Sequence, residues 1–297
     1  FGESDESSKL TVDFGFLPPM SIGNRVWLDS GQTTTGIDID QYNNGIMDGT
    51  EEGISGVKVA LYYSSDLTKA IRTTDTDSEG YYLFDRVQPG DYVIKVIADN
   101  FNKKTSGTDN YTALVDYISS TSNSTVNDDG DDGDDGVDAS DYLTKGISST
   151  ASLTMSHDNE PTNSDPDPLA NKEIDTDGSA SLYGTEKAGL YDQEDDDSNL
   201  TVDFSFVAPP RSLGNRLWYD NGGTSGSGGI ANNGIMDGDE APVDGADVSL
   251  YLDQNKDGIP DDTNGDTLFD ENDAIRTDTT DTNGYYLFDN LPPATYL

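Results

Sequence analysis

The chain has 297 residues, with 58 Asp and Glu against 16 Lys and Arg, and its formal net charge is -42 at pH 7. So acidic a surface repels nucleic acids and anionic membranes, which excludes both as expected partners. Cysteine is absent, so disulfides and thiolate metal sites are excluded, and no apolar run reaches the roughly 18 residues of a membrane span. The β-branched and aromatic residues occur in runs separated by Gly, Asn and Asp, which favours a folded β protein over a disordered acidic tail.

Internal repetition organises the chain. Two motifs occur twice, at residues 10–16 and 200–206 and at residues 21–29 and 212–220. Paired prolines at 18–19 and 209–210 stand between each closing motif and the next opening motif, and they predict short, stiff spacers. We therefore expect a closing strand of a preceding repeat at 1–17, a complete repeat at 20–207, and the first half of the next repeat at 211–297.

Within the complete repeat, apolar and polar residues alternate in several short runs. These runs predict strands near 21–28, 56–63, 69–75, 80–86, 91–97, 147–155 and 199–206. The pattern indicates an all-β fold, a tandem seven-stranded antiparallel β-sandwich of immunoglobulin-like type with long acidic loop insertions. Residues 98–146 fit this plan least, and we interpret them as an inserted acidic loop region with a short helix near 112–119.

A repeated acidic loop carries the main functional signal. In residues 43–51 and 232–240, Gly allows a sharp turn, an aliphatic residue offers its carbonyl, and Asp and Glu follow at the spacing of the second half of a calcium loop. The predicted Ca²⁺ ligands are Asn44, Ile46, Asp48 and Glu51 in the first copy and Asn233, Ile235, Asp237 and Glu240 in the second.

The front half of this loop is interrupted. Counting back from Gly45 puts Asp40 at the first ligand position, whereas the equivalent residue of the second copy is Gly229, which offers no side-chain oxygen. Asp29 and Asp220 end the two opening strands and form the alternative, if they close the site across the insertion. Both alternatives stay open at the level of sequence, and Asp29, Asp40 and Asp220 are all candidate ligands.

A third loop is uninterrupted and occurs only in the second repeat. Its oxygen-bearing residues stand at positions one, three, five and nine, with Gly at six, as in a calcium loop. The predicted ligands are Asp253, Asn255, Asp257, Ile259 and Asp261. Asp77 and Asp281, before the two Gly-Tyr-Tyr strands, are predicted either as turn residues or as further ligands. The acidic run 128–138 is interpreted as a loose calcium site or a hydrated loop.

Other conspicuous residues favour packing over chemistry. Trp27 and Trp218 have apolar neighbours and are expected in a core. Tyr81 and Tyr285 favour cross-strand packing over a row that binds glycan. His157 is the only histidine, and the calcium loops account for the paired carboxylates that a glycosidase would need. No enzymatic activity and no catalytic residue are predicted.

The motifs resemble the B-type repeats of serine-aspartate repeat surface proteins, which are related to the Cna-B domains of collagen adhesins. The resemblance is carried by Ile22–Asp29, Gly45–Glu51, Gly53–Val57, Thr76–Phe84 and Leu200–Phe206. It implies extracellular, calcium-dependent, rod-like β-sandwich modules that carry or space an adhesive head. Some related B domains contain an isopeptide crosslink. Lys58 is the residue to test for one, but its outward phase and its replacement by Asp247 in the next repeat argue against it.

These observations predict a calcium-stabilised spacer in a bacterial surface adhesin or filament, with its anchor and signal peptide outside this segment. The expected partners are neighbouring repeats of the same chain, with self-association into filaments as a further option. One alternative is an adhesive module that binds a host or environmental protein or glycan through the 98–146 insertion. Another is a filament subunit that exchanges strands between molecules.

Overall fold

The computed structural model describes residues 20–102, 113–121, 133–149, 152–156, 198–263, 265 and 270–297. The predicted closing strand at 1–17, His157 and the first part of the acidic run, 128–132, lie outside the described residues. The chain divides into two compact units. The first comprises residues up to 26, 53–113 and 122–204, and the second comprises 27–52, 114–121 and 205–297. These units do not coincide with the sequence repeats.

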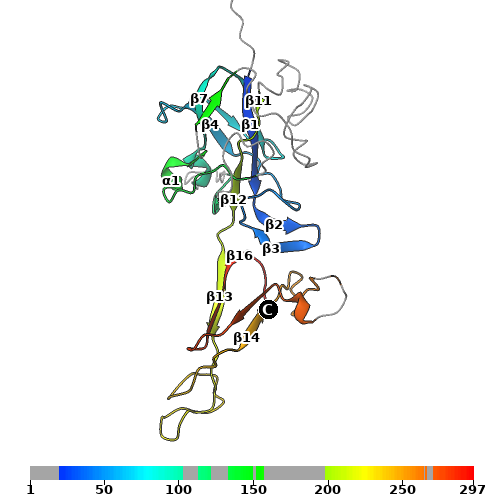
Figure 1. Cartoon of the computed structure of the whole chain (residues 1–297), viewed down its shortest axis with the longest axis vertical. Coiled ribbons are helices and arrows are strands. Elements are labelled where there is room, and N and C mark those ends of the chain that lie inside the picture. The colour runs from blue at the N-terminus through cyan, green and yellow to red at the C-terminus, as the bar shows by residue number, and fades with distance from the viewer. Residues whose placement is uncertain are drawn as a thin grey trace, which may run out of the picture. The chain divides into compact units, whose positions relative to one another are not determined.

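One sheet of the fold is built on β7, which pairs with strands on both sides. Its order is β10-β7-β4-β5, with β9 also pairing with β7, and every described pairing is antiparallel. The strands are β4 (Lys58–Tyr63), β5 (Arg72–Asp75), β7 (Gly90–Val96), β9 (Ile147–Ser148) and β10 (Leu153–Met155). Figure 1 shows β4 and β7 side by side in this sheet.

A second sheet is built on the opening strand β1. Its order is β11-β1-β12-β8, and β6 also pairs with β1. The strands are β1 (Met20–Leu28), β6 (Tyr81–Val87), β8 (Ile118–Ser119), β11 (Ser198–Asn199) and β12 (Phe204–Val207). The expected all-β sandwich is confirmed, with two corrections. Each of the two sheets has five strands among the described residues, instead of seven strands in all. β11 runs parallel to β1 rather than antiparallel, because the chain reaches this edge through a long connection and not through a hairpin.

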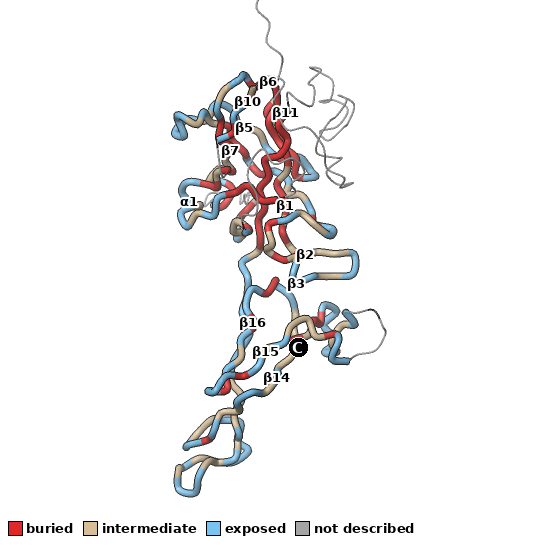
Figure 2. Tube along the Cα trace, in the orientation of Figure 1, coloured by how far each residue is buried: buried red, intermediate tan, exposed pale blue. Residues whose placement is uncertain are grey.

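Both sheets contribute to the buried core (Figure 2). Ile22, Tyr82 and Phe84 come from the β1–β6 pair, and Leu61 and Ile94 come from the β4–β7 pair, all with at most 2% of their surface exposed. The Tyr82 ring packs against Phe84, with ring centroids 6.0 Å apart. Its hydroxyl donates to the Val202 carbonyl at 2.6 Å, so the buried polar tip of this tyrosine is satisfied.

The inserted region is the part of the fold that sequence reasoning described least well. The helix expected near 112–119 is wrong for the described residues: residues 113–116 form turns, and β8 follows. The short helices lie elsewhere, at η2 (Ala98–Phe101) and α1 (Tyr142–Lys145). None of the described helices is long and apolar enough to span a bilayer.

The opening pair of strands is repeated in the second compact unit. β13 (Arg211–Arg216) pairs with β16 (Tyr285–Leu291), and Gly214 lies opposite Leu287 as Gly23 lies opposite Leu83. The guanidinium of Arg25 also stacks on Tyr81, with its carbon 4.9 Å from the ring centroid. Arg216 stacks on Tyr285 in the same way, at 5.1 Å. β14 (Asp247–Leu250) pairs with β15 (Arg276–Thr279), in the register of β4 with β5. The second-repeat strands are therefore built on the same pairings as the first.

The turn before β6 requires glycine. Gly80 has φ +89°, and a Cβ there would lie 2.3 Å from the Val26 carbonyl oxygen. We expect Gly80→Ala to lower the free energy of unfolding by about 2–4 kcal/mol, because backbone strain and a backbone clash combine. Gly56→Ala is the matched control: its φ is +73°, but its Cβ would meet nothing within 4 Å. It should cost about 1–2 kcal/mol, from conformation alone. Urea unfolding midpoints would test this, and equal losses for the two variants would contradict it.

Candidate metal centre

The three predicted loops share one backbone conformation. In each, the fourth and sixth positions adopt positive φ, which lets consecutive backbone amides turn toward the residue at the first position. The values are 57° and 74° for Asn43 and Gly45, 57° and 73° for Asn232 and Gly234, and 60° and 80° for Lys256 and Gly258. The same local fold therefore occurs three times in the described chain, twice in interrupted and once in uninterrupted form.

Asp29 closes the first loop across the insertion. Its carboxylate accepts from the amide of Asn43 at 2.7 Å and from the amide of Gly45 at 2.8 Å. In the uninterrupted loop, Asp253 accepts from the amides of Asp257 and Gly258 at 3.0 and 3.2 Å. Asp29 is therefore structurally equivalent to the first-position Asp253, although the insertion separates Asp29 from the rest of its loop.

Asp40, the other candidate for the first position, lies elsewhere. It is on β3 (Gly36–Tyr42), its side chain is 90% exposed, and its carboxylate lies 4.0 Å from the guanidinium of Arg276. Counting back along the chain fails here because residues between Gly31 and Asn43 form a hairpin, β2 (Ser30–Thr33) with β3, instead of continuing the loop.

The back half of the first loop keeps the expected order. Asn44 accepts from the amide of Ile46 at 2.8 Å and donates to Asp48 at 3.1 Å. The Ile46 side chain is 41% exposed, so this residue is not part of the core. Glu51 is buried and accepts from the amide of Gly31 at 2.8 Å. The loop's front and back halves are therefore joined through both Asp29 and Glu51.

Burial makes the first loop electrostatically unfavourable by itself. Burial is the main cause that raises the pKa of Glu51 to about 8; the charges of Asp29 and Asp48 contribute, and the hydrogen bond from the Gly31 amide opposes them. The pKa values of Asp29 and Asp48 are also raised, in both cases mainly by burial. One oxygen of Asp48 (Oδ1) and one of Glu51 (Oε2) are buried without a hydrogen-bond donor. A cation would supply what these oxygens lack.

A segment distant in sequence covers the first loop. The Ser120 hydroxyl donates to Asp29, and Ser120 Oγ lies 3.1 Å from the amide oxygen of Asn43. The backbone amide of Thr121 donates to the same oxygen of Asn43 at 3.1 Å. Sequence reasoning missed both residues, because no motif surrounds them and they reach the loop only through the β8–β12 pairing.

The second copy has corresponding bonds, and its Asp220 lies nearer to solvent than Asp29, although Glu240 is as buried as Glu51. Asp220 accepts from the amides of Asn233 and Gly234 at 3.2 and 2.7 Å, and the Gly234 bond lowers the pKa of Asp220. Asn233 donates to Asp237 at 2.8 Å. Glu240 accepts from the amides of Gly222 and Asp237, at 2.8 and 3.1 Å. Ile235 is 63% exposed. Asp29 and Asp220 therefore have equivalent bonds in different environments.

The third loop brings its predicted residues together. Asp253 is only 3% exposed, and Asn255 also accepts from the amide of Asp257, at 2.9 Å. Asp257 accepts from the amide of Ile259 at 2.8 Å, as Asn44 accepts from Ile46. Asp261 accepts from the amide of Gln254 at 2.8 Å, which joins the ninth position to the second.

Asp77 and Asp281 hold turns. Asp77 accepts from the amides of Glu79 and Tyr81 at 2.9 and 3.0 Å. Asp281 accepts from those of Asn283 and Tyr285 at 2.8 and 2.9 Å, and the Tyr285 bond is the main cause of its lowered pKa. These bonds account for both aspartates as turn residues.

The described end of the acidic run is buried. Asp135 and Asp203 bond to each other twice: each backbone amide donates to the other residue, at 3.1 and 3.0 Å. Asp134 accepts from the amide of Gly136 at 2.8 Å, and both Asp134 and Asp135 are fully buried. This part of the run therefore packs into the fold and is not a hydrated loop.

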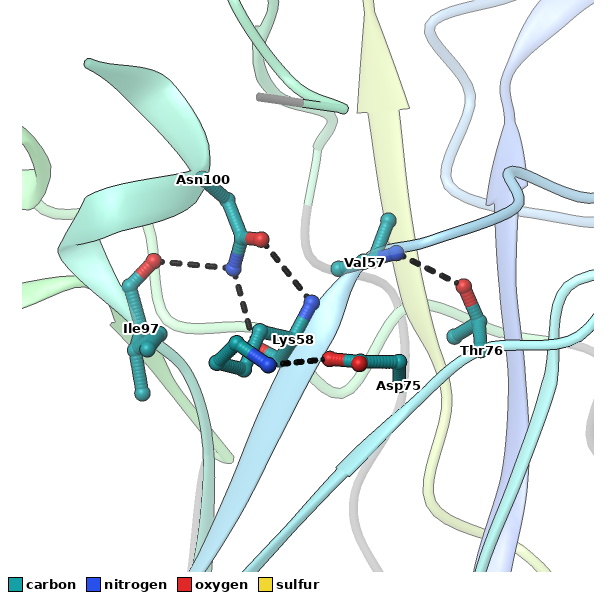
Figure 3. A network of polar contacts seen from close by, with 6 residues as sticks. All are labelled: Val57, Lys58, Asp75, Thr76, Ile97 and Asn100. Atoms are coloured by element: carbon teal, nitrogen blue, oxygen red, sulfur yellow. Dashed lines mark hydrogen bonds and ion pairs between the residues drawn. The ribbon is translucent and has the colours of Figure 1, made fainter. Parts of the chain in front are cut away.

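The remaining candidates pack or pair. Trp27 is fully buried and Tyr81 is 5% exposed, as core and cross-strand packing predict, whereas Trp218 is only partly buried and Tyr285 is 52% exposed. Lys58 is 45% exposed and forms an ion pair with Asp75 at 2.5 Å, so its amine points outward. Figure 3 shows that Asn100 instead binds the backbone at this position. It accepts from the amide of Lys58 and donates to the Lys58 and Ile97 carbonyls.

The residues of the first loop fit a calcium ion, with a restriction. Among the residues that the structure describes, no three Asp, Glu or His side chains are arranged to hold a metal by themselves. A cation at this loop would therefore rely also on the Asn44 amide oxygen and the Ile46 carbonyl, which are ligand types that calcium accepts. The donor-free oxygens of Asp48 and Glu51 are the observation that favours such an ion.

The comparisons with known proteins agree with the resemblance that the sequence motifs carry. Residues 20–165 match the family model of the SdrD B-like domain. The chain is 29% identical to serine-aspartate repeat-containing protein F of Staphylococcus epidermidis, over 100% of the chain and 17% of that protein. It is 27% identical to serine-aspartate repeat-containing protein D of Staphylococcus aureus strain Newman, over 99% of the chain and 14% of that protein. The chain thus spans less than a fifth of these relatives.

Among solved structures, the Bacillus anthracis TIE protein aligns with 93% of the chain and 28% of its own, at a TM-score of 0.28 and 8% identity. A streptococcal ancillary pilin aligns with 100% of the chain and 58% of its own length, at a TM-score of 0.27 and 11% sequence identity. Neither score supports an argument about function. The match to the family model covers residues 20–165. Over these residues it confirms the predicted resemblance to the B-type domains of serine-aspartate repeat proteins.

Proposed function

We propose that this chain is a calcium-stabilised structural segment of an extracellular bacterial surface protein, in which it acts as a stiff spacer. Its partners on this proposal are neighbouring repeats of the same chain. The family resemblance supports the surface location. The strand pairings support the tandem arrangement, because β13 and β16 reproduce the register of β1 and β6. On this proposal, residues 20–207 are one repeat and residues 211–297 begin the next.

The observation that carries the calcium role is the first loop. It buries Asp29, Asp48 and Glu51, the charges of Asp29 and Asp48 help to raise the pKa of Glu51, and an oxygen of Asp48 and one of Glu51 have no hydrogen-bond donor. Buried carboxylates without a counter-charge destabilise a fold, whereas the same carboxylates around a divalent cation stabilise it. The loop therefore supports the folded state best when calcium is bound.

The size of the effect follows from linkage. A ligand that binds only the folded state stabilises it by about 2.7 kcal/mol per site at a hundredfold excess over Kd. Such a gain suits an acidic extracellular segment that lacks cysteine, because disulfides are not available to it. Stiffness would follow from occupancy, because Asp29 and Glu51 join the two halves of the loop.

Melting curves in calcium and in EDTA test this function. We expect the full chain to melt at a lower temperature in EDTA, and Glu51→Gln to lose most of that difference, because it removes one buried charge and one ligand. Glu52→Gln is the matched control, since the neighbouring Glu52 is exposed, and it should keep the wild-type difference. Equal melting temperatures in calcium and EDTA for the wild-type chain would refute the calcium role.

A further inference from the structure

The hairpin β2–β3 is inserted into the first loop, and its base is held by the loop's own carboxylates. Glu51 accepts from the amide of Gly31 at the start of the insertion, and Asp29 accepts from the amide of Asn43 at its end. The amide of Thr50 donates to the Gln32 carbonyl at 2.7 Å. The direction in which the hairpin projects therefore depends on the conformation of the loop.

The end of the hairpin at Tyr42 and Asn43 contacts residues that follow the Pro209-Pro210 spacer or adjoin it. These contacts lie within the second compact unit, which contains residues from both sides of the spacer. Tyr42 is 3% exposed, and its hydroxyl donates to the carbonyl of Ala208, next to the spacer. The side-chain Nδ2 of Asn43 donates to the side-chain oxygen of Asn290 at 3.3 Å.

The hairpin turn meets the third loop. A Cβ on Gly36 would lie 2.6 Å from the side-chain nitrogen (Nε2) of Gln254, so the Gln254 side chain packs closely against the hairpin turn. The hairpin and residues 252–263 also line a cavity of about 610 Å³, to which Asp38 and Asp261 contribute. Acidic side chains from both segments thus share this cavity, and they oppose close approach unless a cation neutralises part of the charge.

We infer that the β2–β3 hairpin is a clamp through which the first loop positions the strands that follow the spacer. The partner surface is on the same chain: the carbonyl of Ala208, the side chain of Asn290 and the third loop around Gln254. The inference rests on the proposed calcium function, because an ion at the first loop neutralises Asp29 and Glu51 and so fixes the base of the hairpin. Without the ion, the buried oxygen of Glu51 lacks the ligand that would join it to the rest of the loop, and the hairpin base is released.

Spin-label distance measurements on the full chain test the clamp, because a chain without native cysteine can be labelled at chosen sites. One label goes on Thr34→Cys in the exposed hairpin turn, and the other on Thr277→Cys, an exposed position of β15. We expect a narrow distance distribution in calcium and one broadened about twofold or more in EDTA, because release shifts the population toward undocked states. The pair Asp244→Cys and Thr277→Cys, which omits the hairpin, should stay unchanged.

A variant separates docking from ion binding. Tyr42→Phe removes the hydroxyl that binds Ala208 but keeps every predicted ligand, so it should broaden the distribution in calcium while calcium affinity stays at the wild-type value. Tyr219→Phe, at a 55% exposed tyrosine, is the control and should change neither. Calorimetry on the same samples distinguishes the failures. If calcium binds but the spin-label distance distribution does not narrow, the clamp alone is overturned. If calcium does not bind, both the clamp and the proposed function are overturned.

Discussion

Replacing Asp29 by alanine is expected to destabilise the second compact unit far more than the same change at Asp220. Asp29 is fully buried and accepts from two backbone amides and from the hydroxyl of Ser120. Alanine would leave these donors unsatisfied in a region that water does not reach. The expected loss is about 3–5 kcal/mol, since each buried unsatisfied donor costs about 1–3 kcal/mol and removal of a buried charge offsets part of the sum.

Asp220→Ala is the matched control because Asp220 makes the equivalent bonds to Asn233 and Gly234 near solvent. Water can satisfy the released amides there, so a much smaller loss is expected. Urea unfolding followed by hydrogen-exchange mass spectrometry reads residues 27–52 and 217–243 separately, which matters because a chain with two units need not unfold in one step. A comparable loss of protection at the two loops would show that burial does not distinguish them.

Stability in EDTA is expected to fall as the pH rises from about 4.5 to about 8. The folded chain raises the pKa of Glu51 from 4.5 to about 8, mainly by burial, so it binds a proton more tightly than the unfolded chain does. The stability that this proton confers is fully present below about pH 4.5 and is lost as the pH rises through about 8. The raised pKa values of Asp29 and Asp48 act in the same direction.

Other groups act oppositely, but at lower pH. Hydrogen bonds lower the pKa values of Asp220 and Asp281, so their contributions are present above about pH 3.8 and disappear as the pH falls below it. The general repulsion of a chain with net charge -42 also increases with pH, so a control is needed. Glu51→Gln should flatten the decline between pH 5 and 8, and saturating calcium should do the same, because a bound cation favours the ionised carboxylates. A stability in EDTA that rises with pH over this range would contradict the assignment.

Much of the fold was predictable because its signals are local. Alternation in Gly56–Tyr62 and in the Gly-Tyr-Tyr motifs predicted β4, β6 and their second-repeat counterparts, and the structure places strands there. The region from 98 to 146 was not predictable in the same way. Its strand β8 has two residues and exists through pairing with β12, and the buried Asp135 is held by Asp203, which is distant in sequence.

The loop shows the same division between local and distant information. Gly45 and Gly234 predicted their positive φ values, and the spacing predicted the roles of Asn44, Asp48 and Glu51 within the loop. Whether Asp29 or Asp40 completes the loop could not be decided, because that depends on the intervening residues folding back as a hairpin. The contact of Ser120 with Asp29 had no sequence signal, since a single serine far along the chain predicts nothing by itself.

Calorimetric titration of the full chain with calcium, beside Glu51→Gln and Glu52→Gln, tests the central claim most directly. The account predicts saturable binding to the wild-type chain, with proton release near neutral pH because Glu51 must ionise to bind. Glu51→Gln should bind one fewer ion with less proton release, and Glu52→Gln should match the wild type. Absence of saturable binding, or an unchanged site number in Glu51→Gln, would contradict the assignment of a calcium site to the loop that Asp29 and Glu51 close.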